Sequence, residues 1–165
     1  MHKIGILSDI HGYWDDRYLQ YFQSCDEIWI AGDIGSIDVY NRLKAYKPVR
    51  AVFGNIDGQD LRYEIHESEV FTCEKVKVVM KHIGGRPPKY DAHALNLISE
   101  HHPNLFVCGH SHILQVKYDD NHQLLYVNPG AAGKYGFHKV RTLFRLTIDG
   151  DKFTDLEVIE LEKGL

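Results

Sequence analysis

The sequence predicts an α/β fold: a single domain of two packed mixed β-sheets flanked by helices, which makes a four-layer α-β-β-α sandwich. Short apolar runs alternate with amphipathic stretches in the first half, as in parallel strand–helix–strand units. In the last third, apolar runs follow one another with turn signals at Asp120-Asn121 and Asp149-Gly150, as in antiparallel sheets. The length of 165 residues suits one domain spanning 1–165.

The expected elements follow from these patterns. Helices are expected at 13–22, 36–46 and 92–101, between and after the first strands. Three segments are expected to be loops, 58–64, 84–91 and 131–140, and the prolines near residue 88 exclude the second from a sheet interior. Strand-like alternation without a helix is expected over 64–82, as in 76–80. The other expected strands are 4–7, 27–30, 49–53, 105–108, 114–118, 124–127, 142–148 and 153–161.

The composition is that of an ordinary globular domain, with 44 % apolar and 25 % charged residues. No apolar run is long enough to predict a membrane span, and the first residues lack the apolar core of a signal peptide. We therefore expect a cytoplasmic protein with no membrane partner. The three cysteines, Cys25, Cys73 and Cys108, are too scattered for a disulfide framework and are interpreted as small buried apolar residues.

The charge balance limits the partners. There are 19 Lys and Arg against 23 Asp and Glu, a net charge of −4, and no basic stripe is visible. A protein that holds long nucleic acid through its phosphates usually shows such a stripe. We therefore expect a small ligand and no long nucleic acid.

Polar side chains gather where predicted strands end. Five strands are each followed by Asp, His or Asn, and ligands of open α/β sheets bind outside the carboxyl ends of the strands. We therefore expect all five clusters to meet in one crevice. In chain order the clusters contain Asp9 and His11, then Asp33, then Asn55 and Asp57, then His82, and last His110 and His112.

These residue types indicate metal chemistry. Imidazole, carboxylate and amide oxygen without thiolate suit first-row divalent ions. Asp9 and His11 lie two residues apart, so both can reach one ion, and His110 and His112 repeat that spacing. Seven ligands exceed one tetrahedral site but fit two ions that share a carboxylate. We expect two Mn²⁺ ions, with Fe, Zn, Ni and Co as alternatives.

The charge of such a centre suits a phosphate ester. Two divalent ions, the carboxylates of Asp9 and Asp33 and one bridging hydroxide leave a small positive charge. Paired ions of this kind hold both the attacking and the leaving oxygen of a phosphoryl group. The expected substrate is therefore a small phosphate ester, attacked by the bridging hydroxide.

The ordered motifs Asp-x-His, Gly-Asp, Gly-Asn, a lone His and Gly-His-x-His resemble those of the calcineurin-like metallophosphoesterase superfamily. The short chain and Asn128-Pro129-Gly130 resemble its compact YfcE-like phosphodiesterase branch. The resemblance implies a phosphodiesterase. It also implies that Asp9, His11 and His112 bind the first ion, that Asn55, His82 and His110 bind the second, and that Asp33 bridges the two.

One position departs from the family pattern. Many relatives carry His after Gly-Asn, where it is thought to protonate the leaving group, whereas this chain has Ile56. General acids contribute roughly 10²–10⁴-fold to such reactions. We therefore expect weak hydrolysis of esters with poor leaving groups, unless His138, Arg86 or Lys134 supplies the missing proton.

The remaining assignments complete the expected site. Asp57 is interpreted as the partner of a ligand histidine, with a simple turn residue as the alternative. With Asp33, Asn55 and His110 it forms the set assigned to catalysis. His2 and five other histidines are assigned to the surface.

Two other functions stay open. The superfamily includes a non-catalytic scaffold subunit of the retromer coat, which resembles an incomplete site, whereas all seven ligands are present here. A nuclease is the other alternative, against which the acidic balance argues. The sequence leaves open a homo-oligomer, either a dimer or a tetramer.

Overall fold

The structure is a computed structural model that describes residues 1–164. Its first sheet has five strands in the order β12-β11-β1-β2-β3. Strands β1, β2 and β3 run parallel, and β11 joins β1 in antiparallel pairing, as does β12 with β11. The bounds are β1 His2–Leu7, β2 Glu27–Ala31, β3 Val49–Val52, β11 Val140–Asp149 and β12 Lys152–Glu162.

The second sheet also has five strands, in the order β4-β5-β8-β10-β9. Its central strands β5, β8 and β10 are parallel, while β4 and β9 pair antiparallel at the two edges. The bounds are β4 Ser68–Cys73, β5 Val76–Lys81, β8 Leu105–Val107, β9 Gln115–Asp119 and β10 Leu124–Asn128. A small separate hairpin is formed by β6 Gly85–Arg86 and β7 Lys89–Tyr90.

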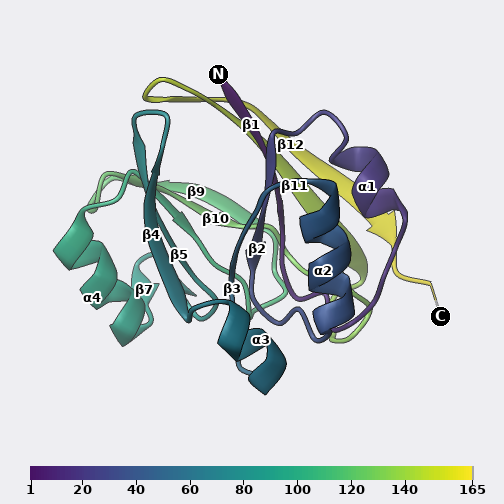
Figure 1. The fold of residues 1–165 in the computed structure, drawn as a ribbon. Helices are drawn as coiled ribbons and strands as arrows, with labels where there is room; N and C mark the ends of the chain where they lie inside the picture. Colours follow the sequence, from purple (N-terminus) through teal and green to yellow (C-terminus); the bar gives the residue numbers. More distant parts are fainter. Residues whose placement is uncertain (165) are drawn as a thin grey trace.

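The helices lie outside the two sheets. Figure 1 shows α1 and α2 against the outer face of the first sheet and α4 on the far side of the second. This arrangement is the four-layer α-β-β-α sandwich that the sequence predicted. The bounds are α1 Arg17–Tyr21, α2 Ile37–Tyr46, α3 Gln59–Glu64 and α4 Ala92–His101. Across residues 1–164, no helix has the length and apolar content needed to cross a bilayer.

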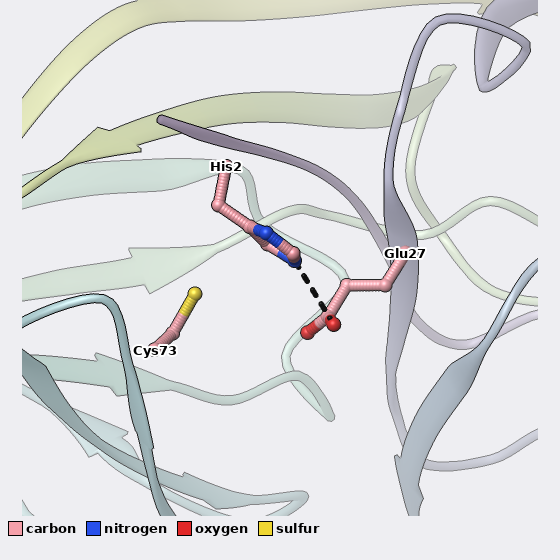
Figure 2. Close-up of side chains that lie close together, drawn as sticks. All are labelled: His2, Glu27 and Cys73. Atoms are coloured by element: carbon pink, nitrogen blue, oxygen red, sulfur yellow. Dashed lines mark ion pairs between the residues drawn. The ribbon is translucent and has the colours of Figure 1, made fainter.

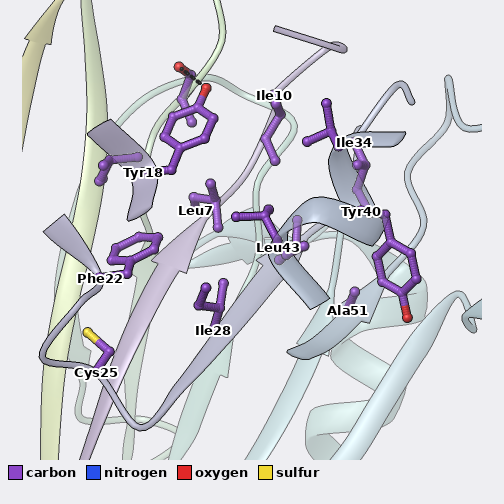
Figure 3. Close-up of a cluster of buried hydrophobic side chains, with 14 of the residues drawn as sticks. Leu7, Ile10, Tyr18, Phe22, Cys25, Ile28, Ile34, Tyr40, Leu43 and Ala51 are labelled. Carbon is purple, nitrogen blue, oxygen red and sulfur yellow. Dashed lines mark hydrogen bonds between the residues drawn. The ribbon is translucent and has the colours of Figure 1, made fainter. Parts of the chain in front are cut away.

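Three apolar clusters fill the three spaces between the layers. The first lies between the first sheet and its helices and includes Leu7, Ile28 and Leu43 (Figure 3). The second lies between the sheets and is built from both, and the third packs α4 against the second sheet. Because side chains alternate along a strand, β1 serves two clusters at once. Ile4 and Ile6 enter the cluster between the sheets, while Leu7 faces the helices.

A glycine sets the distance between β1 and the chain that follows α1. A Cβ at Gly5 would lie 2.4 Å from the ring of Phe22, so only glycine lets that ring pack on the strand. Phe22 is fully buried there (Figure 3). The close approach anchors the first helix layer on the strand that leads to Asp9.

Three expectations differ from the structure. The helix expected at 13–22 is reduced to Arg17–Tyr21, because Tyr13 N bonds Ile10 O and the Asp15 carboxylate accepts from Arg17 N, so the residues before it form turns. The loop expected at 58–64 contains α3, whose Leu61 is buried in the first cluster. The loop expected at 84–91 contains the hairpin of β6 and β7.

A buried ion pair ties β11 to the segment before α1. The fully buried Arg141 donates from Nη1 to Asp15 Oδ2 at 3.0 Å and from Nε to Ala132 O at 2.6 Å. Burial alone would raise the pKa of the Asp15 carboxyl, but hydrogen bonds from Arg17 and Arg141 outweigh it and lower that pKa to about 2. The ionised carboxylate is therefore favoured by folding.

We expect Asp15→Asn to lower the free energy of unfolding at pH 7 by about 2 kcal/mol, because one pKa unit corresponds to about 1.4 kcal/mol. A depressed pKa stabilises the fold above the unfolded pKa near 4 and loses this effect as the pH falls towards 2. The difference between wild type and variant should therefore be equal at pH 7 and 5 and clearly smaller at pH 3. Urea unfolding across this range measures it, and a difference independent of pH would contradict the prediction.

Candidate metal centre

The carboxyl ends of the parallel strands in both sheets meet at one end of the sandwich. Backbone hydrogen bonds join the loops that follow them: Asp9 N to Gly32 O at 3.0 Å, Gly109 N to His82 O at 2.9 Å and Ala132 N to Ser8 O at 2.8 Å. The second bond joins the segments after β8 and β5, and the third joins the segments after β10 and β1. The structure thus gathers the side chains that sequence analysis assigned to five separate strand ends.

The first group of ligand atoms comes from Asp9, His11 and His112, which lie within 4.8 Å of one another. Asp9 Oδ1 lies 3.2 Å from His112 Nε2 and 3.9 Å from His11 Nε2. The other carboxylate oxygen, Oδ2, accepts from Ser8 Oγ at 2.9 Å and from His110 N at 3.0 Å. These two bonds fix the carboxylate so that Oδ1 faces the histidines.

The second group comes from Asp33, His82 and His110. His82 Nε2 lies 3.2 Å from Asp33 Oδ2, and the Asn55 amide oxygen lies 3.2 Å from His110 Nδ1. Asp33 Oδ2 is also 3.5 Å from His11 Nε2, which belongs to the first group. Asp33 therefore stands between the two groups, where a bridging carboxylate would be placed.

Three buried polar atoms at this centre have no hydrogen-bond partner within residues 1–164: Asp9 Oδ1, His11 Nε2 and His82 Nε2. Buried polar atoms nearly always have a hydrogen-bond partner, because a buried polar atom without one lowers the stability of the fold. His82 Nδ1 bonds Ala31 O at 2.7 Å, which leaves the lone pair of Nε2 directed at the carboxylates. Nitrogen and oxygen atoms unpaired in this way fit divalent metal ions.

The backbone is strained at five of the seven candidate ligands. Asp9, His11, Asp33, His110 and His112 have φ values of 53°, 48°, 51°, 72° and 63°. Residues other than glycine seldom adopt this left-handed region, at a cost of about 1–3 kcal/mol each, and such strain clusters at functional sites. Within residues 1–164, five of the nine non-glycine residues with positive φ are therefore candidate ligands.

The charges of the centre support one another. Burial disfavours a charge on His82, but the Asp33 carboxylate beside it and the charge of Asp9 outweigh burial and raise the pKa of the imidazole. Burial would raise the pKa of the Asp33 carboxyl, but His82 and the Ile56 N–H lower it below its ordinary value. Burial lowers the pKa of His11, which the two carboxylates offset only in part. A proton and a metal ion would therefore compete for His82 Nε2.

Asp57 was expected to contact a ligand histidine, but its carboxylate contacts backbone N–H groups instead. Its buried carboxylate accepts from Gly35 N and Gly54 N, both at 2.8 Å, and from Ile34 N at 3.3 Å. It thus joins the loops after β2 and β3 through their backbone and bonds to no ligand histidine among the described residues. The interpretation as a histidine partner is wrong, because three N–H donors occupy the carboxylate.

Gly54 is the point where these two loops touch. A Cβ at this residue would lie 2.1 Å from Asp33 Oδ1, so glycine is required for Asp33 to occupy its place. Asp33 Oδ1 is further held by Ile56 N at 3.1 Å, which leaves Oδ2 facing the histidines. The Gly-Asn motif after β3 therefore positions Asp33 as well as contributing Asn55.

His138 lies against a ligand. Its Nδ1 is 3.3 Å from His112 Nδ1, and its Nε2 is 2.8 Å from Gly133 O. Since the carbonyl must accept, His138 Nε2 carries the proton and its Nδ1 accepts from His112 Nδ1. This tautomer leaves the lone pair of His112 Nε2 facing Asp9. Burial lowers the pKa of His138, in keeping with a neutral ring that orients His112.

A cavity of about 680 Å³ opens beside the centre. His110 and His112 form one wall, and the exposed side chains of Ile113, Tyr135 and Phe137 form much of the rest. The Tyr135 ring lies 4.8 Å from the His11 ring. The sequence predicted a loop at 131–140 but did not single out Tyr135 and Phe137, because that loop carries no motif and only the fold brings it back to the strand ends; Ile113 directly follows the last motif.

Of the other candidate proton donors, Lys134 has its Nζ 4.8 Å from the ring of Tyr13. Arg86 lies on the β6–β7 hairpin and lines a smaller cavity together with His110. Arg86 therefore shares a cavity with a candidate ligand, whereas the recorded contact of Lys134 is with Tyr13.

A four-layer sandwich with two groups of nitrogen and oxygen ligands at its strand ends defines a metallophosphoesterase fold. The chain belongs to the calcineurin-like phosphoesterase superfamily, whose domain profile matches residues 2–151. The resemblance inferred from the motifs is thus confirmed.

Several known proteins are similar to this chain. The probable metallophosphoesterase MJ0623 of Methanocaldococcus jannaschii is 29 % identical over 136 residues, which cover 78 % of this chain and 67 % of that protein. The solved structure of an archaeal phosphodiesterase has a TM-score of 0.76 at 22 % identity, covering 96 % of this chain and 99 % of the other. Vps29 from Entamoeba histolytica, solved with zinc, also has a TM-score of 0.76, at 17 % identity with 98 % and 99 % covered. At these identities the solved structures show the fold alone.

We expect Asp33→Asn to abolish binding of both metal ions, because a single carboxylate oxygen lies near ligands of both groups. Elemental analysis after reloading with Mn²⁺ measures ions per chain. Asp38→Asn is the matched control, since Asp38 is an exposed carboxylate in the first turn of α2. A variant that keeps two ions per chain while the control behaves like wild type would show that Asp33 is no bridge.

Proposed function

We propose that this protein is a metal-dependent phosphodiesterase that hydrolyses small phosphate esters at a binuclear centre. The observation that carries the proposal is the position of Asp33 Oδ2, 3.2 Å from His82 Nε2 and 3.5 Å from His11 Nε2. One carboxylate oxygen shared by two groups of ligands is what a pair of adjacent ions requires. Membership of the phosphoesterase superfamily supports the same reading.

The ligand chemistry favours Mn²⁺ or another first-row divalent ion, because no thiolate takes part. Two such ions, when bound, would provide a hydroxide nucleophile at neutral pH and neutralise charge on the phosphoryl oxygens. The chain's own contribution is orientation. Ser8 and the His110 N–H hold Asp9, the Ile56 N–H holds Asp33, and His138 holds His112.

The cavity beside the centre supports a diester as substrate. A diester carries a second organic group, which a monoester lacks and which must be accommodated next to the phosphorus. Ile113, Tyr135 and Phe137 offer an apolar surface for that group, adjoining His110 and His112. An apolar or aromatic alcohol is therefore the substituent that we expect the site to prefer.

The leaving group receives little help from the protein. Ile56 stands where an imidazole would act as general acid, and its side chain is 47 % exposed beside Asn55. Both ring nitrogens of His138 are already engaged, which favours orientation of His112 over proton donation. The substrates that we expect to be hydrolysed well are those whose alcohols leave without protonation.

The fold likeness to Vps29 fits the main alternative, a binding protein with this fold. Against it stand the completeness of the ligand set and the unpaired buried atoms, which a relic site would have no reason to retain. A nuclease is less well supported, because the net charge is −4 and long nucleic acid favours basic surfaces.

We expect diesterase activity to vanish in a chelator and to return with Mn²⁺. His110→Ala should abolish turnover yet leave the unfolding temperature of the metal-free protein unchanged, because His110 is exposed and lies outside the apolar clusters. Initial rates on aryl diesters, aryl monoesters and cyclic nucleotides measure the activity. His93→Ala is the control, since His93 is an exposed histidine on α4. Failure to hydrolyse any of these esters with any first-row ion would favour the binding protein.

We expect rates on aryl methyl phosphates to rise steeply as the leaving phenol becomes more acidic. Ile56→His should raise the rate for poor leaving groups most, by up to about 10²-fold, because it restores a general acid. The measurement is the slope of log kcat/KM against the pKa of the phenol for both proteins. A flat slope in wild type would mean that another group already donates the proton, and His138→Gln would test that donor.

A further inference from the structure

A second group of metal-ligating side chains lies at the opposite end of the sandwich. His2 is the first residue of β1, Glu27 is the first residue of β2, and Cys73 is the last residue of β4. Because β1 and β2 are parallel, their amino ends lie away from the carboxyl ends that carry the candidate metal centre. Two of these residues belong to the first sheet and Cys73 to the second.

The three side chains converge. One ligand atom of each lies within 4.8 Å of the others, and His2 Nε2 is 3.0 Å from Glu27 Oε2. Figure 2 shows the Cys73 sulfur directed towards the His2 ring, with the Glu27 carboxylate facing the same ring. The alternation of the strands explains this. His2 shares a strand face with Ile4, and Glu27 shares one with Trp29, so both point into the space between the sheets.

Neighbouring groups orient the ligands as they do at metal sites. His2 Nδ1 lies 4.0 Å from Asp26 Oδ2, beyond hydrogen-bond distance, while Nε2 faces Glu27. Glu27 Oε1 accepts from Trp29 Nε1 and lies 3.6 Å from Arg50 Nε, which leaves Oε2 facing His2. A donor on the distal oxygen of a ligand carboxylate, as Trp29 is for Glu27, is a typical outer contact at metal sites.

We propose that His2, Glu27 and Cys73 form a zinc site that joins the two sheets at this end of the sandwich. One imidazole nitrogen, one carboxylate oxygen and one thiolate are ligands that Zn²⁺ accepts in tetrahedral geometry. The site differs in kind from the other centre, because it contains a sulfur atom. It is independent of the proposed hydrolysis and serves to stabilise the packing of β4 against β1 and β2.

The charges at this site suit a cation. Glu27 and a deprotonated Cys73 together neutralise a divalent ion. The side chains of His2 and Glu27 are 33 % and 16 % exposed, so water can reach the fourth position. Burial, with the charges of Glu27 and Glu74, raises the pKa of the Cys73 thiol to about 11.

The test is a Co²⁺ titration of the metal-free full chain, without a histidine tag. Cobalt bound to a thiolate absorbs in the near ultraviolet through charge transfer from sulfur, whereas the candidate metal centre offers only nitrogen and oxygen. We expect wild type to show this absorption, Cys73→Ser to lack it, and His110→Ala to retain it. Cys25→Ser is the matched thiol control, because Cys25 is also a buried thiol and lies in a different cluster, and this variant should also retain the band.

Three results would overturn the proposal: no charge-transfer band in wild type at saturation, a band that survives in Cys73→Ser, or a band lost in Cys25→Ser. If Cys73→Ser does not fold by circular dichroism, His2→Gln replaces it, since His2 is partly exposed. That variant keeps the thiol and should weaken the Co²⁺ affinity read from the band by at least about tenfold. An unchanged Co²⁺ affinity in His2→Gln would likewise contradict the proposed zinc site.

Discussion

The backbone hydrogen bonds that join the strand-end loops of the two sheets are the constraint on which the candidate metal centre depends. Gly109 N bonds His82 O between two loops of the second sheet, and Ala132 N, after β10, bonds Ser8 O, after β1 of the first sheet, so the loops are held at fixed spacing. The side chains that follow these loops then face one volume from both sheets. A metal centre assembled from so many chain segments needs such fixed spacing, because a shift of one loop would remove a ligand.

Burial of the three apolar clusters offsets the free-energy cost of the strained and buried polar residues at this centre. Five left-handed ligand residues cost about 1–3 kcal/mol each, and two buried carboxylates add to the cost. The loops are attached to strands whose side chains are almost fully buried, so the strain cannot relax without exposing core. Arg141 also stabilises this arrangement. It donates to Ala132 O, and Ala132 N donates to Ser8 O directly after β1.

Orientation by outer contacts is common to both ends of the sandwich. At the carboxyl ends, each candidate ligand carboxylate has one oxygen held by N–H or hydroxyl donors and one oxygen facing the histidines. At the amino ends, Glu27 repeats this arrangement with Trp29 on one oxygen and His2 on the other. The same physical rule therefore supports a nitrogen and oxygen centre at one end and a site that includes sulfur at the other.

The sequence by itself determined the fold class, the family and the candidate ligands, because these rest on local patterns: strand and helix periodicity, and motifs of one to four residues at strand ends. It placed α2 and α4 within one residue, since their apolar spacing and caps are local. Tertiary structure alone decided the contacts between distant segments. Asp57 bonds the backbone of two loops, His138 touches His112 across 26 residues, and Cys73 reaches His2 from the other sheet. No local pattern encodes such pairs, because the packing of two sheets sets their distances.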